Sequence, residues 1–125
     1  VASAMTDVTG FGLAGHLMSI LEGSGLEAEI DLDAVPVLSG AEELAASGIR
    51  SSIWEANSAL RERMSPGRCA RSDLLFDPQT AGGLLACVPE GQARGVLDAL
   101  LEAGEVAATI GRLSPGQPFI HVKGV

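Results

Sequence analysis

The chain has 125 residues, 46% hydrophobic with 16 glycines, a composition typical of one globular domain and not of a disordered segment. Its net charge of −8 argues against duplex nucleic acid and anionic membrane surfaces as partners. No signal peptide is apparent, and no apolar run approaches the roughly 20 residues that cross a bilayer. Cys69 and Cys87 lack a metal-like spacing, so a reducing, cytoplasmic compartment is expected.

The pattern of apolar residues predicts alternating strands and helices. In chain order we expect a strand over 1–5, a helix from Thr9 to the "EGSG" at 22–25, a strand over 26–32, helices over about 40–47 and 53–64, a loop over 65–73, a strand over 84–88, a helix over 89–104, and strands over 105–113 and 118–122. This order predicts an α+β fold in which helices pack on a ferredoxin-like sheet with an elaborated middle.

Two helices carry clear apolar stripes. In the first, the stripe consists of Leu13, Leu17, Ile20 and Leu21. In the helix after Pro89, it consists of Ala93, Val96, Leu97, Leu100 and Leu101. Both spacings match one helical face, and we expect the stripe from Ala93 to Leu101 to lie in the core. We also expect the strand over 84–88 to be buried, with Cys87 as a small buried hydrophobic side chain.

The opening motif, "AMTDVTGFGLAGHL" at 4–17, suggests a metal–nucleotide site. Thr9 is a good N-cap, and Gly10 and Gly12 leave backbone amides uncovered at a helix start, where an anion such as phosphate is favoured. Asp7 would repel that phosphate unless a divalent cation lay between them, and magnesium takes such a carboxylate together with phosphate oxygens.

Each of these residues also has a structural interpretation. Asp7 could cap the following amides, as turn aspartates often do, and the glycines could allow the helix to approach the sheet. In "DPQTAGGLL" at 77–85, Thr80, Gly82 and Gly83 form either a tight turn or a loop that faces phosphate. His16 is expected to be a packed or surface histidine.

Four arginines supply half of the basic charge within eleven residues: Arg61, Arg63, Arg68 and Arg71. We interpret this cluster as a solvated face, with anion binding or docking of another domain as the alternative.

Together, the two motifs make the chain resemble the C-terminal domain of selenophosphate synthetase (selenide, water dikinase), within the aminoimidazole ribonucleotide synthetase-like superfamily. "PVLSGA" at 36–41 and "AATIGRL" at 107–113 also match that family in position. The resemblance implies a single domain over 1–125 that belongs to a two-domain enzyme. Because the sequence opens at Val1 inside an apolar segment, we expect the N-terminal ATP-binding domain to lie upstream of it.

The resemblance implies an activity that makes selenophosphate, AMP and phosphate from ATP, selenide and water. It assigns Asp7 to Mg²⁺ and implies a homodimer of the full-length protein. The family's catalytic cysteine and lysine lie near its N terminus, so no catalytic residue is expected in this chain. The stretch "GIRSSIWEANSALR" at 48–61 departs from the family pattern and keeps only Asn57.

Two alternatives remain open. The chain could be a stand-alone binding or interaction domain that kept the fold and lost the chemistry, or half of another ATP-using synthetase or kinase of the superfamily.

Overall fold

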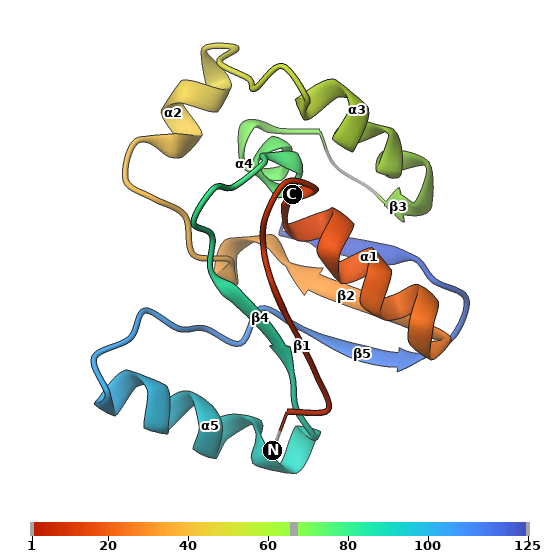
Figure 1. Ribbon diagram of the computed structural model, residues 1–125, viewed down its shortest axis with the longest axis vertical. Coiled ribbons are helices and arrows are strands. Elements are labelled where there is room, and N and C mark those ends of the chain that lie inside the picture. The colour runs from red at the N-terminus through yellow and green to blue at the C-terminus, as the bar shows by residue number, and fades with distance from the viewer. Residues whose placement is uncertain (1, 66–67, 125) are drawn as a thin grey trace.

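Helices and strands alternate along most of the chain in the computed structural model, which describes residues 2–65 and 68–124 (Figure 1). In order, the elements are β1 (Ala4–Asp7), α1 (Gly12–Ser24), β2 (Leu26–Asp31), η1 (Leu32–Ala34), α2 (Ala41–Ala46), α3 (Trp54–Ser58), η2 (Ala59–Arg63), β3 (Met64–Ser65), α4 (Ala70–Asp73), η3 (Leu74–Phe76), β4 (Leu84–Cys87), α5 (Glu90–Glu102), β5 (Gly111–Pro115) and β6 (Ile120–Lys123). The predicted α+β class is confirmed.

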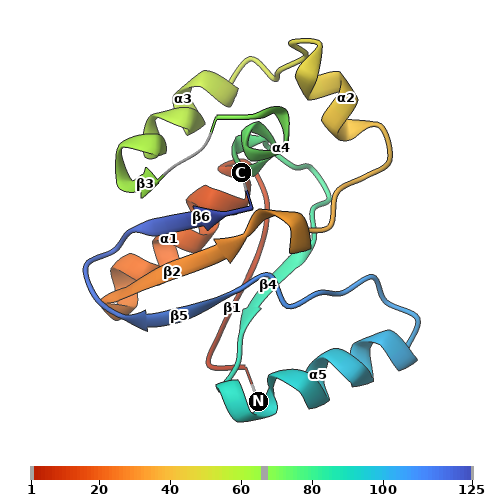
Figure 2. The same ribbon diagram turned by 180° about the vertical axis from the view of Figure 1, so that it is seen from behind.

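The described strands divide between two sheets. One has four strands in the order β3-β6-β2-β5, and the other is the antiparallel pair β1–β4. In the larger sheet β2 is central, because Ala28 pairs with Leu113 of antiparallel β5 and with Ile120 of parallel β6. The β1–β4 ribbon runs separately beside this sheet in both views (Figures 1 and 2).

Helix α1 covers one face of the four-stranded sheet (Figure 2). Leu17 and Leu21 are buried, and Leu13 and Ile20 are half-buried against the same core, so the predicted stripe of the first helix is confirmed. The helix closes at Gly25, which has φ 64° and donates its amide to the Leu21 carbonyl at 2.9 Å. Left-handed backbone of this kind favours glycine and satisfies an otherwise unpaired carbonyl.

Charged side chains of this sheet form exposed ion pairs. Lys123 Nζ lies 2.9 Å from Glu29 Oε1, and His121 Nε2 lies 3.5 Å from Glu27 Oε2. The hydrogen bond from Lys123 holds the pKa of the Glu29 carboxyl below its usual range. The alternation of apolar and charged residues predicted for β2 is therefore confirmed, with Ala28 and Ile30 buried.

Several predicted boundaries shift in the structure. The first strand ends at Asp7, so Asp7 belongs to β1 and not to the bend that follows it. The predicted loop over 65–73 contains α4, while residues 66–67 of that loop lie outside the described residues. The predicted helix over 53–64 is a short α-helix that tightens into a 3₁₀ turn.

The prediction that the α5 stripe is core is wrong. No residue of α5 is buried, and Leu100 and Leu101 are 42% and 50% exposed. Helix α5 lies at one end of the molecule, away from α1 to α4 (Figures 1 and 2). The stripe is amphipathic as predicted, but no sheet face lies beneath it.

The strands on either side of α5 also depart from expectation. In β4 only Leu85 is buried, whereas Leu84 is 73% exposed and Cys87 is half-buried. The strand predicted over 105–113 begins only at Gly111, where a Cβ would lie 2.0 Å from the Glu29 carbonyl oxygen. Close approach of the β2 backbone therefore requires glycine at this position. None of the described helices is both long and apolar enough to span a membrane.

Candidate functional site

The two sequence motifs, about 70 residues apart in the chain, lie side by side in the fold. The Val8 amide donates to the Gly83 carbonyl at 2.9 Å, and the Gln79 amide donates to the Thr9 carbonyl at 3.0 Å. A Cβ on Gly82 would lie 2.1 Å from the Val8 carbonyl oxygen. Antiparallel pairing of β1 with β4 therefore brings the middle of the first motif, at Val8 and Thr9, onto the loop of the second.

Asp7 is the last residue of β1, opposite Leu84 in the ribbon. Its side chain is exposed and makes no hydrogen bond or ion pair with any described residue. The carboxylate thus caps no amide in the described part of the chain, and both oxygens are available to a ligand. No three His, Cys, Asp or Glu side chains of the described residues are grouped closely enough to hold a metal ion by themselves. A cation at Asp7 would need further ligands that the His, Cys, Asp and Glu side chains of the described residues do not supply.

The prediction that Thr9 caps the first helix is wrong. The helix begins at Gly12, its N-cap is Phe11, and no side chain caps it. The Gly12 amide donates to the Thr9 carbonyl at 3.1 Å, so a turn separates Thr9 from the helix. The Thr9 hydroxyl lies instead 3.1 Å from His16 Nε2, and the His16 ring lies 5.5 Å from the ring of Phe11. His16 is therefore a packed, half-buried histidine, as expected.

Four glycines of the two motifs have different structural roles. Gly12 has φ 75°, and a Cβ there would lie 2.8 Å from the Leu75 carbonyl oxygen, so this glycine allows α1 to pack on η3. Gly82 similarly allows β1 and the second motif to approach one another. Gly10 and Gly83 have open space where a Cβ would be, and the Gly10 amide donates to no described residue. Of the four, Gly10 and Gly83 leave backbone open toward solvent.

Asn57 was not among the predicted site residues, yet it holds this loop in place. Its Nδ2 donates to the Gly10 carbonyl at 2.9 Å and to the Phe76 carbonyl at 3.0 Å. It therefore ties α3 to the first motif and to η3. The sequence contained one indication of this role, because Asn57 matches the family pattern within the stretch 48–61, which otherwise departs from it.

Three of the four clustered arginines are engaged in pairs. Arg61 shares the Asp73 carboxylate with Arg50, and Arg63 pairs with Glu22 at 3.2 Å. Arg71 donates to the Leu32 and Val35 carbonyls and to Glu42. The prediction of a solvated face is therefore wrong for Arg61 and Arg71, which are partly buried and bind neighbouring segments together.

With this geometry in place, comparison with known proteins identifies the family. A family model described as "AIR synthase related protein, C-terminal domain" matches residues 1–123. The chain belongs to this family.

Curated relatives of this family member include selenide, water dikinases. The Escherichia coli enzyme is 42% identical over 125 residues, which cover 96% of this chain and 36% of the relative. The Myxococcus xanthus enzyme is 38% identical over 98% of this chain and 36% of its own length. Selenide, water dikinase 2 of Peptoclostridium acidaminophilum is 40% identical over 86% of this chain and 32% of its length. The chain thus spans about a third of these relatives, and the resemblance inferred from the motifs is confirmed.

A solved structure supports the fold. Thiamine-monophosphate kinase from Stenotrophomonas maltophilia superposes with a TM-score of 0.67, covering 98% of this chain and 32% of that protein. At 23% sequence identity, this likeness extends to the fold alone.

Proposed function

We propose that this chain is the C-terminal domain of a selenide, water dikinase, which makes selenophosphate, AMP and phosphate from ATP, selenide and water. The relatives that are 38–42% identical to it carry that name, and they match the chain over most of its length. In this proposal the ATP-binding domain and the catalytic nucleophile belong to the remainder of the enzyme, which acts as a cytoplasmic homodimer. The 125 residues alone are therefore inactive.

Within that enzyme, Asp7 supplies one ligand to Mg²⁺, and the paired motifs face the phosphates of ATP. The observation that carries this proposal is the meeting of the two motifs beside a carboxylate that no described residue pairs. A bound Mg²⁺ would neutralise charge on the phosphates, which is its usual contribution to phosphoryl transfer.

The chain's own residues hold that surface in shape. The residues that form the phosphate-binding surface in this proposal are Thr9, Gly10, Gly12, Thr80, Gly82 and Gly83. Gly12 and Gly82 act indirectly, because their missing side chains let three backbone segments meet. Gly10 and Gly83 leave backbone uncovered for a phosphate oxygen, and Asn57 fixes the position of the Gly10 peptide.

The test is Asp7→Asn in the full-length enzyme that contains this domain. The substitution keeps the shape of the side chain and removes its charge, so a ligand to Mg²⁺ should be weakened. We expect turnover to fall on the order of 10²-fold, with a higher magnesium requirement, while the melting temperature stays the same.

The matched control is Asp98→Asn, because Asp98 is an exposed carboxylate on α5 whose one ion pair with a described residue is with Arg94 at 3.2 Å. Its turnover should match that of the unsubstituted enzyme. Near-normal turnover of Asp7→Asn, with an unchanged magnesium dependence, would contradict the assignment of Asp7 and leave the domain a binding module.

A further inference from the structure

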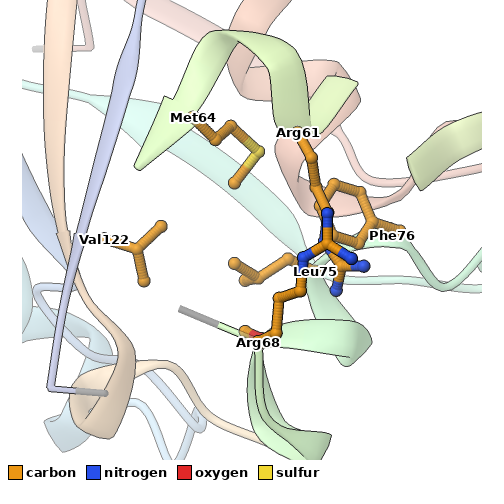
Figure 3. A pocket seen from close by; sticks show the side chains of 7 residues that line it. Arg61, Met64, Arg68, Leu75, Phe76 and Val122 are labelled. Carbon is orange, nitrogen blue, oxygen red and sulfur yellow. The ribbon is translucent and has the colours of Figure 1, made fainter. Parts of the chain in front are cut away.

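A cavity of about 200 Å³ is lined by residues of η2, β3, α4, η3 and β6 and by Arg68, which precedes α4. Two guanidinium groups, those of Arg61 and Arg68, line it together with an apolar wall (Figure 3). The apolar wall comes from Met64, Leu75, Phe76 and Val122. Neither sequence motif contributes a residue to this cavity, so it is separate from the surface around Asp7.

The positive charge at this cavity exceeds the acid available to it. Asp73 is the acidic partner of Arg61, and it shares its two oxygens between Arg61 and Arg50. Arg68 makes no hydrogen bond or ion pair within the described ranges 2–65 and 68–124. The two guanidinium groups that line the cavity therefore have only a share of one carboxylate among the described residues, in a chain whose net charge is −8.

Arg61 is held ready for a ligand. Its guanidinium hydrogen-bonds to Asp73 and lies 4.9 Å from the centre of the Phe76 ring, and its side chain is only 21% exposed. A guanidinium fixed by an ion pair and an aromatic face loses little freedom when it binds an oxyanion, and its remaining N–H groups match the spacing of oxygens on phosphate or carboxylate.

We propose that this cavity binds a small organic phosphate, with the oxyanion between Arg61 and Arg68 and the organic part against Met64, Leu75 and Val122. The paired guanidinium groups select for the anion. The apolar wall favours a ligand with a compact hydrophobic body over a bare ion, since burial of that body adds to the free energy of binding. The proposal does not depend on the function proposed for Asp7.

Phenyl phosphate and inorganic phosphate are the probes, titrated into the full chain at constant ionic strength and followed by amide chemical shifts. We expect saturable shifts at Ser72, Leu75 and Val122. The dissociation constant should be about tenfold lower for phenyl phosphate, a difference of about 1.4 kcal/mol that burial of one aromatic ring supplies. Equal affinity for the two probes would overturn the role of the apolar wall, and the absence of saturable shifts would overturn the site.

Arg68→Ala tests the guanidinium pair without touching the Asp73 network. It should raise the dissociation constant of phenyl phosphate about tenfold or more, a loss typical of a charged hydrogen-bonding partner. The matched control is Arg94→Ala, which removes the same charge from an exposed position on α5 (side chain 85% exposed) and should leave binding unchanged. Equal effects of the two substitutions would show non-specific attraction to net charge and would overturn the proposal.

Discussion

Helices α1 and α5 each have 13 residues and follow a strand of the same β1–β4 ribbon, yet they end in opposite environments. Helix α1 contains five buried residues, which pack on the four-stranded sheet and on η3, whereas α5 contains none. An ion pair joins α5 to the sheet, between Glu90 and Arg112 at 3.0 Å, and it is exposed and contributes at most about 1 kcal/mol. Two similar sequence patterns therefore give one helix that packs into the core and one that lies at an end of the molecule.

An apolar stripe specifies which face of a helix is hydrophobic, but not which segment that face packs against. Exposed hydrophobic side chains occur on the ribbon at Met5 and Leu84, on α5 at Leu100 and Leu101, and after α5 at Val106. A two-stranded ribbon is only marginally stable by itself, so the α5 end of the fold has few contacts to hold it. We therefore expect this end to open at a lower free energy than the α1 core.

The largest expected difference comes from shortening one leucine in each helix. Leu21 in α1 is 0% exposed, so Leu21→Ala should lower the free energy of unfolding by about 3 kcal/mol through lost burial and a residual cavity. Leu101→Ala in α5 should lower it by less than about 1 kcal/mol, because half of that side chain already meets solvent. Urea unfolding of both variants measures the difference. Equal losses would mean that the α5 stripe is buried as deeply as the α1 stripe.

Glycine-to-alanine substitutions in the two helices should change the stability of the fold in opposite directions. Gly12→Ala places a Cβ 2.8 Å from the Leu75 carbonyl oxygen at φ 75°, and should destabilise the fold by about 2 kcal/mol. Gly95→Ala lies inside α5 with open space around it, and should stabilise the fold by about 0.5–1 kcal/mol. Melting temperatures of the two variants provide the measurement. A stabilising Gly12→Ala would show that α1 does not approach η3 this closely.

The smallest of these expected differences is in the rate at which the two cysteines react with an alkylating reagent. Burial raises the pKa of the Cys87 thiol, on the strand directly before α5, and a higher pKa leaves less reactive thiolate at pH 8. Iodoacetamide should therefore modify Cys87 more slowly than exposed Cys69. Urea below the unfolding midpoint should speed up reaction at Cys87, since β4 belongs to the weakly held end. Faster reaction at Cys87 than at Cys69 without urea would contradict the burial of its thiol.

Local patterns were sufficient for much of the fold. The stripe of α1, the alternation in β2 and the α+β class followed from periodicity, because those features depend on neighbours in the chain. The two motifs also gave the family, and the structure adds that they touch, through Val8, Gly83, Thr9 and Gln79. That contact was not predictable from spacing, since it depends on how β1 and β4 pair.

The predictions that failed all required knowledge of distant segments. Thr9 has the chemistry of an N-cap, but its carbonyl accepts from Gln79 and Gly12, and its hydroxyl pairs with His16. The sequence predicted that Arg61 and Arg71 are solvated. In the structure Arg61 pairs with Asp73, and Arg71 donates to the carbonyls of Leu32 and Val35, so both side chains are partly buried.

Which helix and strand faces are apolar, and where glycine interrupts a helix, could be predicted from the chain alone, because short-range sterics and side-chain polarity decide those properties. The two motifs were also sufficient to identify the family. Three features are visible only in the folded molecule: α1 packs on a sheet while α5 does not, Gly12 and Gly82 allow close backbone contacts, and Arg61 and Arg68 line one cavity. Each of these depends on contacts between residues far apart in the chain, and no local period encodes which segments those contacts join.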